Sequence, residues 1–196
     1  MPNLVFDPAD EANNQLIHQF EVEYEDVFNL WNLYNEAYRW LRDNEFEDTD
    51  THDSQFETLY HHKIGSEGSV QHRIWWRTEH TPLDSKYFKY FIKVDFRTIN
   101  MSTVQVERKG KQVQANKGDV IIRVESYLML DAFRTWRDSS WSYFHSFFKR
   151  RFAERINEEQ VQVYKLSTDF QATLKNFLEM KNPSPQTEPF HPRDGV

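Results

Sequence analysis

The sequence predicts an α+β fold, with an antiparallel sheet of five to six strands and with an N-terminal strand and helix and two C-terminal helices packed on one face. Several segments alternate polar and apolar residues, which is typical of strands that bury one face. Apolar residues recur at helical spacing once near the start and twice near the end. We assign the single domain to residues 16–181, with a flexible lead-in at 1–15 and a disordered tail at 182–196.

The first half of the chain predicts a strand, a helix and a hairpin. The alternation over His18–Tyr24 favours a strand. Apolar residues then take up helical spacing and acids stand first, where the helix dipole favours them, so a helix is expected over Glu25–Arg42. An acidic loop follows. Strands are expected at about 55–64 and 70–80, joined by a glycine-containing turn.

The next strand, expected at about 86–99, has the most regular alternation in the chain. Its polar residues, which include Lys89 and Lys93, are expected on a solvated face. Turns are expected at 108–111 and 116–118, before a last strand at about 119–130. The apolar face of the first of these strands comprises Phe88, Tyr90, Ile92, Val94 and Phe96.

Two separate helices are predicted to close the domain. One apolar stripe runs over Trp141–Ile156 and another over Val163–Phe177. We expect the first of these helices to cover the apolar face of the sheet. Its covering residues are Trp141, Phe144, Phe148 and Phe152.

The element order resembles the START-like, or helix-grip, superfamily of the SRPBCC type. The resemblance lies in the strand-to-helix run Phe20–Trp31 and in the aromatic helix Trp141–Ile156. It implies a curved meander with a long terminal helix across its concave face. The segment from Tyr90 to Trp136, with Lys117–Val124 at its centre, also resembles uncharacterised archaeal proteins of similar length, and that resemblance implies no function.

Composition and charge narrow the classes of function. The absence of cysteine excludes disulfides, zinc–thiolate sites and a cysteine nucleophile. The first 57 residues carry 15 acidic and 2 basic side chains, whereas the rest carry 16 acidic and 22 basic ones. We find neither a secretory signal nor an apolar run of the ~20 residues that span a bilayer, so we expect a cytoplasmic protein without a membrane span. A net charge of −7 disfavours nucleic acid as a partner.

Two histidines form the one unusual pair in the sequence. If the hairpin turn lies between Ser66 and Glu67, His62 stands opposite His72, on the same apolar face as Tyr60. Directly opposed imidazoles could hydrogen-bond to each other or to Tyr60, or could ligate one metal ion. A third metal ligand cannot be placed from the sequence. A metal-assisted enzyme that uses His62 and His72 therefore remains one alternative.

No recognised catalytic motif or phosphate-binding loop occurs, so an enzymatic activity stays open and we favour a non-enzymatic role. The first hypothesis is a module that binds an apolar or aromatic small molecule in a cavity between the sheet and the C-terminal helix. The cofactor, if there is one, is unknown. The predicted ligand contacts are His62, His72, Tyr60, Trp76, Phe88, Tyr90, Ile92, Phe144 and Phe148.

The alternative hypothesis is an interaction protein that binds another protein or associates with RNA. The uneven charge favours it, because such a molecule would have an acidic N-terminal face and a basic face made by a turn and a helix. Trp40 falls outside the main apolar stripe of its helix and is expected to be exposed. The predicted contacts are Trp40, Lys109, Lys111, Lys149, Arg150, Arg151 and Arg155.

Overall fold

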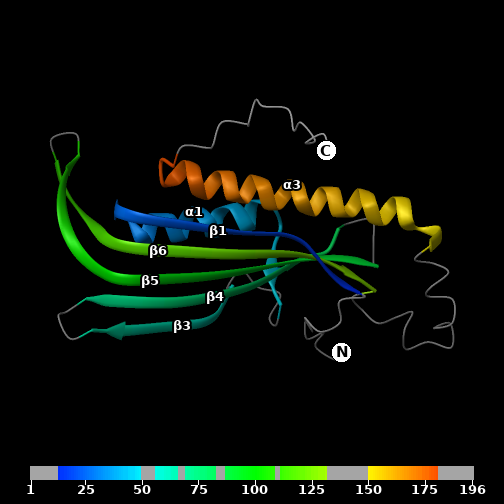
Figure 1. Ribbon diagram of the computed structural model, residues 1–196, viewed down its shortest axis with the longest axis horizontal. Coiled ribbons are helices and arrows are strands. Elements are labelled where there is room, and N and C mark those ends of the chain that lie inside the picture. Colours follow the sequence, from blue (N-terminus) through cyan, green and yellow to red (C-terminus); the bar gives the residue numbers. More distant parts are fainter. Residues whose placement is uncertain are drawn as a thin grey trace, which may run out of the picture.

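The protein folds as a sheet with helices gathered on one side (Figure 1). The structure, a computed structural model, describes residues 13–49, 56–65, 69–82, 87–108, 111–131 and 150–180, with the backbone alone for 107, 108, 111 and 113. The elements in these parts are β1 (Asn14–Phe28), α1 (Leu30–Asp43), β2 (Glu47–Asp48), β3 (Glu57–Ile64), β4 (Val70–His80), β5 (Phe88–Arg108), β6 (Lys111–Leu130) and α3 (Ala153–Phe177). The predicted α+β class is confirmed.

All strand pairings in the sheet are antiparallel. The strand order is β1-β6-β5-β4-β2, and β3 also pairs with β4. The first strand therefore lies beside the last one, and it begins at Asn14, inside the segment expected to be a lead-in. None of the helices in the described part of the chain is long and apolar enough to cross a membrane.

The prediction that a helix begins at Glu25 is wrong, because β1 continues to Phe28. Pairing with β6 extends along the whole of this segment, with Glu25 opposite Asp119 and Phe28 opposite Asn116. The side chain of Asn29 then caps α1, accepting a hydrogen bond of 2.9 Å from the backbone N–H of Asn32. Ladder hydrogen bonds and a side-chain cap outweigh the preference of the two acids for a helix start.

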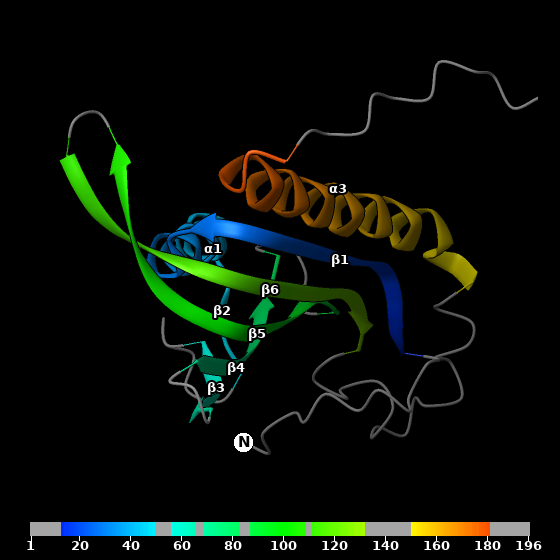
Figure 2. The ribbon, with the colours of Figure 1, turned by 60° about the vertical axis from the view of Figure 1, so that its left-hand side comes forward.

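The expected turn at 116–118 is also wrong, because these residues lie within β6. Here β5 contains one residue more than β6: Ile99 pairs with Asp119, whereas Ser102 pairs with Lys117. The bulge holds Asn100 at a φ of 51° and Gly118 at 152°, and it increases the local twist. The far end of the β5–β6 hairpin curls toward the side that carries the helices (Figure 2).

The core lies between the sheet and the two helices. α1 buries Leu33, Ala37, Trp40 and Leu41. α3 buries Ile156, Val163, Phe170 and Leu174, so Ile156 and Val163 belong to one helix and not to the two separate helices predicted. Of the expected cover, Trp141, Phe144 and Phe148 lie outside the described residues, and Phe152 is about half exposed.

The expectation that the sheet buries one face and exposes the other to solvent holds only in part. Phe88, Tyr90, Ile92, Val94 and Phe96 are buried on the helix side, as predicted. On the other side of β5, Lys89 and Phe91 are also buried, and the Lys89 amino group lies 2.6 Å from the Glu79 carboxylate. Lys93 is partly buried and ion-paired with Glu125 at 2.9 Å. The Lys89–Glu79 ion pair and the burial of Phe91 therefore withdraw part of this face from solvent, although the alternation of the sequence predicts that the face is solvated.

Replacement of Gly118 at the bend is expected to destabilise the fold. A Cβ atom there would lie 2.9 Å from the backbone oxygens of both Ile99 and Asn100, and L-residues rarely adopt its φ of 152°. Gly118→Ala should lower the free energy of unfolding in urea by about 1–3 kcal/mol. Lys117→Ala, at the exposed neighbouring position, should stay within about 0.5 kcal/mol of the parent. Equal effects of the two substitutions would contradict this account of the bend.

Candidate functional site

The predicted ligand contacts do not form one site. Trp76, Phe88, Tyr90 and Ile92 lie in the packed core. Trp76 is enclosed by aromatic rings, among them Tyr34 at 4.8 Å and Phe96 at 4.8 Å between ring centroids. Tyr60, His62 and His72 lie elsewhere, at the far end of β3 and β4, and Phe144 and Phe148 are outside the described residues.

The hydroxyl of Tyr90 is hydrogen-bonded to a buried carboxylate that the sequence did not predict. Its hydroxyl donates to Glu159 of α3, and Glu159 also forms an ion pair of 2.8 Å with Arg155. Burial, followed by the hydrogen bond to Glu159, raises the pKa of Tyr90 well above its usual value. Glu159 follows Ile156 by three residues and precedes Val163 by four, so helical spacing could have placed it on the buried stripe.

The predicted histidine pair is present, but on an exposed surface. His62 lies directly opposite His72, and the two rings stack at 5.1 Å with an interplanar angle of 15°. The His72 Nδ1 atom is 2.9 Å from the Thr98 hydroxyl. The neighbouring Tyr60 and Ile64 are 55% and 67% exposed, whereas Trp76, at the other end of the hairpin, is buried against Tyr34 and Tyr38 of α1. Within the described residues, no group of three or more potential ligands is placed to hold a metal ion.

The pKa of His72 should depend on its neighbour His62. Burial, and then the charge of His62, lowers the pKa of His72. Its neutral form is thus favoured in the folded state, and its contribution to stability is lost as the pH falls from about 6.5 through that lowered value. His62→Gln should move the pKa of His72 back toward 6.5 without fully restoring it, as measured by NMR titration. An unchanged or lower pKa in this variant would contradict the coupling.

The residues predicted for a protein interaction are also separated. Trp40 is only 8% exposed; its ring packs on Phe170 at 4.7 Å and its indole N–H donates to Asp169 at 2.8 Å. The expectation that Trp40 is exposed is therefore wrong. Arg150 and Arg151 are exposed, and Arg155 is ion-paired with Glu158 and Glu159. Lys109 and Lys149 lie outside the described residues, as does the side chain of Lys111.

A pocket of about 480 Å³ lies where the bent hairpin, the two helices and the end of β1 meet. Most of its wall is apolar or aromatic, and a few amide and acidic groups stand among these side chains. The lining residues are Tyr24, Val27, Phe28, Asn29, Asn32, Val106, Gln114, Ala115, Phe177, Leu178 and Glu179. The sequence predicted a ligand cavity against a helix at Trp141–Ile156, most of which lies outside the described residues. This pocket lies instead at the C-terminal end of α3, and none of the predicted contacts lines it.

Local geometry holds each wall of this pocket in place. The Asn116 side chain accepts a hydrogen bond of 3.2 Å from the backbone N–H of Leu30, which ties the start of α1 to the hairpin. At the other wall, α3 ends in paired hydrogen bonds from Glu179 to Asn176 and from Met180 to Lys175. Glu179 adopts a φ of 54° in this turn. A position that glycine usually occupies is therefore held here by an acidic residue at the pocket wall.

The polar groups of the pocket are neutral or acidic. Burial, followed by the nearby carboxylates of Asp26 and Glu179, raises the pKa of Tyr24, so its phenol is protonated at neutral pH. The C-terminal end of α3 adds the partial negative charge of the helix dipole. These groups can accept hydrogen bonds from a ligand or attract a cationic group, and they disfavour an anion.

A larger hollow of about 760 Å³ adjoins the pocket through Asn32 and Phe177. Polar and charged residues of α1, such as Glu36, Arg39 and Arg42, provide most of its lining. Such a surface offers little apolar area to a ligand, so we regard the smaller pocket as the candidate site.

The pocket residues could not be identified from the sequence. Phe28 and Phe177 stand in periodic apolar patterns that mark them simply as core. Val106 and Ala115 reach the helices because the bulge bends the hairpin, and the glycine that permits this bend resembles an ordinary turn signal. No protein-family model matches this chain, and no curated protein matches its sequence.

Proposed function

We propose that the protein is a non-enzymatic module that binds an apolar or aromatic small molecule, neutral or cationic, in the pocket between the β5–β6 hairpin, α1 and α3. The observation that carries this proposal is the composition of the pocket. Aromatic and aliphatic side chains form a concave wall of about 480 Å³, and a few polar groups converge on it. Ligand pockets of ~300–1,000 Å³ have this character.

The order of the elements supports the same reading. A strand and helix, then an antiparallel meander, and then a long helix across the sheet resemble START-like proteins, and β1 pairs with β6. This support is an analogy of architecture, because function depends on the site and not on the fold. The wall residues Tyr24 and Phe28, with ring centroids 5.9 Å apart and nearly perpendicular planes, offer an aromatic edge to a ligand.

Filling the pocket should weaken ligand binding. Nile red, a neutral apolar dye, is the probe, and its fluorescence on titration with the full chain is the measurement. Val106→Trp, at a partly exposed position of the wall, should weaken dye binding about tenfold or more, equivalent to ~1.4 kcal/mol. Ala115→Phe, on the paired strand, should have the same effect.

The matched control is Val161→Trp, on an exposed position of α3 that does not line the pocket. It should bind the dye like the parent. Native mass spectrometry of protein from its own cells should also show a retained small molecule in the parent and not in the Val106 variant. A parent that binds no dye and retains no molecule, or equal binding by all variants, contradicts the proposal.

The alternative function, binding of a partner protein, is favoured by one surface residue. Trp31 of α1 is 69% exposed and stacks on Tyr34 with an interplanar angle of 4°. Rigid exposed aromatics of this kind are enriched in protein interfaces. If Trp31 lies in an interface, the parent should sediment as a complex or self-associate, and Trp31→Ala should sediment as a monomer. A parent that sediments as a monomer without a co-purifying protein would exclude this alternative.

A further inference from the structure

A row of basic side chains crosses the face of the sheet that points away from the helices. His61 of β3 lies directly opposite Arg73 of β4, and Arg73 lies directly opposite Arg97 of β5. Directly opposed residues have Cβ atoms ~4.5–5.5 Å apart, where like charges destabilise a sheet. Lys63 of β3 stands two residues from His61, on the same face. The fold thus brings several cations from three strands together.

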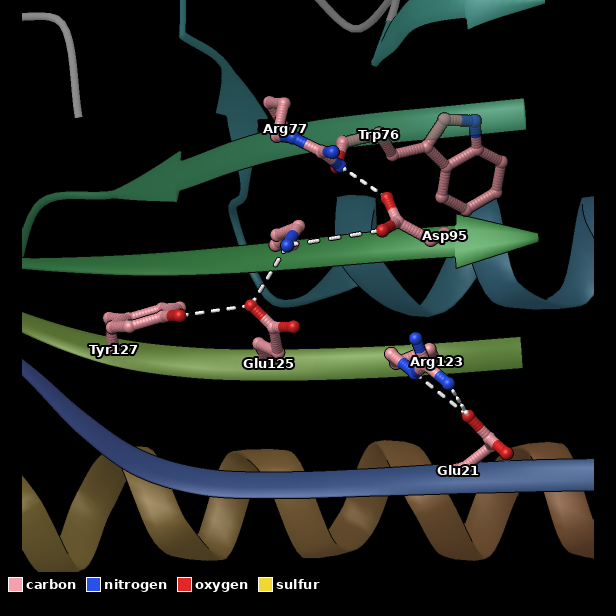
Figure 3. Close-up of polar contacts among 8 residues, drawn as sticks. Glu21, Trp76, Arg77, Asp95, Arg123, Glu125 and Tyr127 are labelled. Atoms are coloured by element: carbon pink, nitrogen blue, oxygen red, sulfur yellow. Dashed lines mark hydrogen bonds and ion pairs between the residues drawn. The ribbon is translucent and has the colours of Figure 1, made fainter. Parts of the chain in front are cut away.

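The adjoining part of this face is organised differently, since each cation there meets an acid (Figure 3). Arg77 donates to Asp95 at 2.7 Å, Lys93 pairs with Glu125 at 2.9 Å, and the Arg123 Nε–H donates to Glu21 at 2.8 Å. By contrast, no acid in the described parts of the chain pairs with Lys63, Arg73 or Arg97. The charges of Lys63, Arg73 and Arg97 are therefore left unbalanced.

Acids near this row do not pair with it: Asp119 of β6, the diagonal neighbour of Arg97, forms no ion pair with it in the described parts of the chain. Asp95, two residues before Arg97 on β5, is occupied by Arg77. In the row itself, Arg97 pairs with Ile121 of β6, and the first acid beyond is Glu23 of β1. Two strand spacings, ~10 Å in all, separate Arg97 from Glu23. No acid of these strands is thus paired with the row, which leaves its arginines available to an external anion.

A hollow of about 430 Å³ lies over the same residues. Its lining includes no acidic side chain: it consists of His61, Lys63, Gln71, His72, Arg73, Arg97 and Thr98. The register of β4 against β5 shifts between Val70 and Arg73, and such bulges bend a strand and redirect its side chains. Lys63, Arg73 and Arg97 of this lining share the outer face of the sheet, whereas His72 and Thr98 alternate with them and belong to the helix side.

An aromatic ring lies next to this hollow. Trp75 follows Arg73 by two residues on β4, so it shares the same face, and it is 41% exposed. The Arg77 guanidinium lies 5.6 Å from the centre of its ring. An exposed indole beside a cationic hollow is the combination with which proteins hold a phosphate and stack its base.

We propose that this surface binds the phosphate groups of a nucleotide, with Arg73 and Arg97 contacting the phosphate oxygens, Lys63 adding charge, His61 offering a ring nitrogen as a hydrogen-bond partner, and Trp75 stacking on the base. Guanidinium groups recognise phosphate oxygens by paired hydrogen bonds. The ligand relieves the repulsion between the two arginines, which accounts for their direct opposition. The site lies on the opposite face from the apolar pocket and does not depend on the function proposed there.

The same chemistry is present in a free nucleotide and in single-stranded nucleic acid. Pyrophosphate, ATP and a fluorescein-labelled oligouridylate are the probes, titrated into the full chain with calorimetry and fluorescence anisotropy. A tighter complex with ATP identifies a free nucleotide as the ligand, and a tighter complex with the oligouridylate identifies a nucleic acid strand. In both cases affinity should fall steeply between about 50 and 200 mM salt, because ionic contacts to phosphate carry it.

Four substitutions locate the site. Arg73→Gln and Arg97→Gln should each weaken the binding of the tighter probe about tenfold or more. Arg123→Gln, which removes one paired charge from the same face, should change it less than about twofold. Trp75→Leu should weaken ATP and oligouridylate binding and leave pyrophosphate binding unchanged. Melting curves in the absence of ligand should show the two arginine variants at least as stable as the parent, which excludes unfolding as the cause.

The proposal is overturned if none of the three probes binds at millimolar concentration. It is equally overturned if Arg123→Gln weakens binding as much as Arg73→Gln and Arg97→Gln do, since the affinity would then follow net charge and not this hollow. Loss of Nile red binding in the pocket variants tests the other proposal, so the two fail separately.

Discussion

The contact of Phe170 with both β1 and α1 joins the parts of this fold. Its ring is fully buried, with its centroid 4.7 Å from that of Trp40 in α1 and 6.5 Å from that of Phe20 in β1. A helix that crosses a sheet must bury its apolar stripe against both the strands and any neighbouring helix. Phe170 does this at the point where α1, α3 and the sheet meet. The position of α3, and hence of both ends of the core, depends on this packing.

Polar contacts then specify how α3 lies on the sheet. The buried Ser167 hydroxyl accepts a hydrogen bond of 2.8 Å from Ser126 of β6 and lies 2.9 Å from the Nδ1 atom of His18 in β1. Buried polar groups are costly unless they are paired, so these contacts penalise any sliding of the helix along the strands. With its position fixed, the last turn of α3 brings Phe177 and Leu178 to the bent hairpin, and the apolar pocket forms between them.

The two faces of the sheet carry opposite kinds of chemistry. On the helix side, apolar groups surround a pocket whose polar atoms are neutral or acidic. On the other side, a ladder of alternating charges ends in a row where His61, Arg73 and Arg97 have no acidic partner among the described residues. The net charge of −7 hides this local excess of cations. Binding surfaces of opposite preference can coexist in one small domain because successive side chains on a strand point to opposite faces.

Alternation and helical spacing alone determined the α+β class and the burial of Phe88 and Ile92 on one face, because these features depend on local periodicity. The pairing of His62 with His72 followed from the sequence only for one position of the hairpin turn, and the structure decided that register. Only the tertiary structure decided the rest. The start of α1 depends on β6 pairing with β1, and the burial of Trp40 depends on Phe170, which lies 130 positions further along the chain. The pocket depends on a bulge around Gly118, and the cationic row depends on the register of three strands. Each of these involves residues distant in sequence, whose contacts no local pattern records.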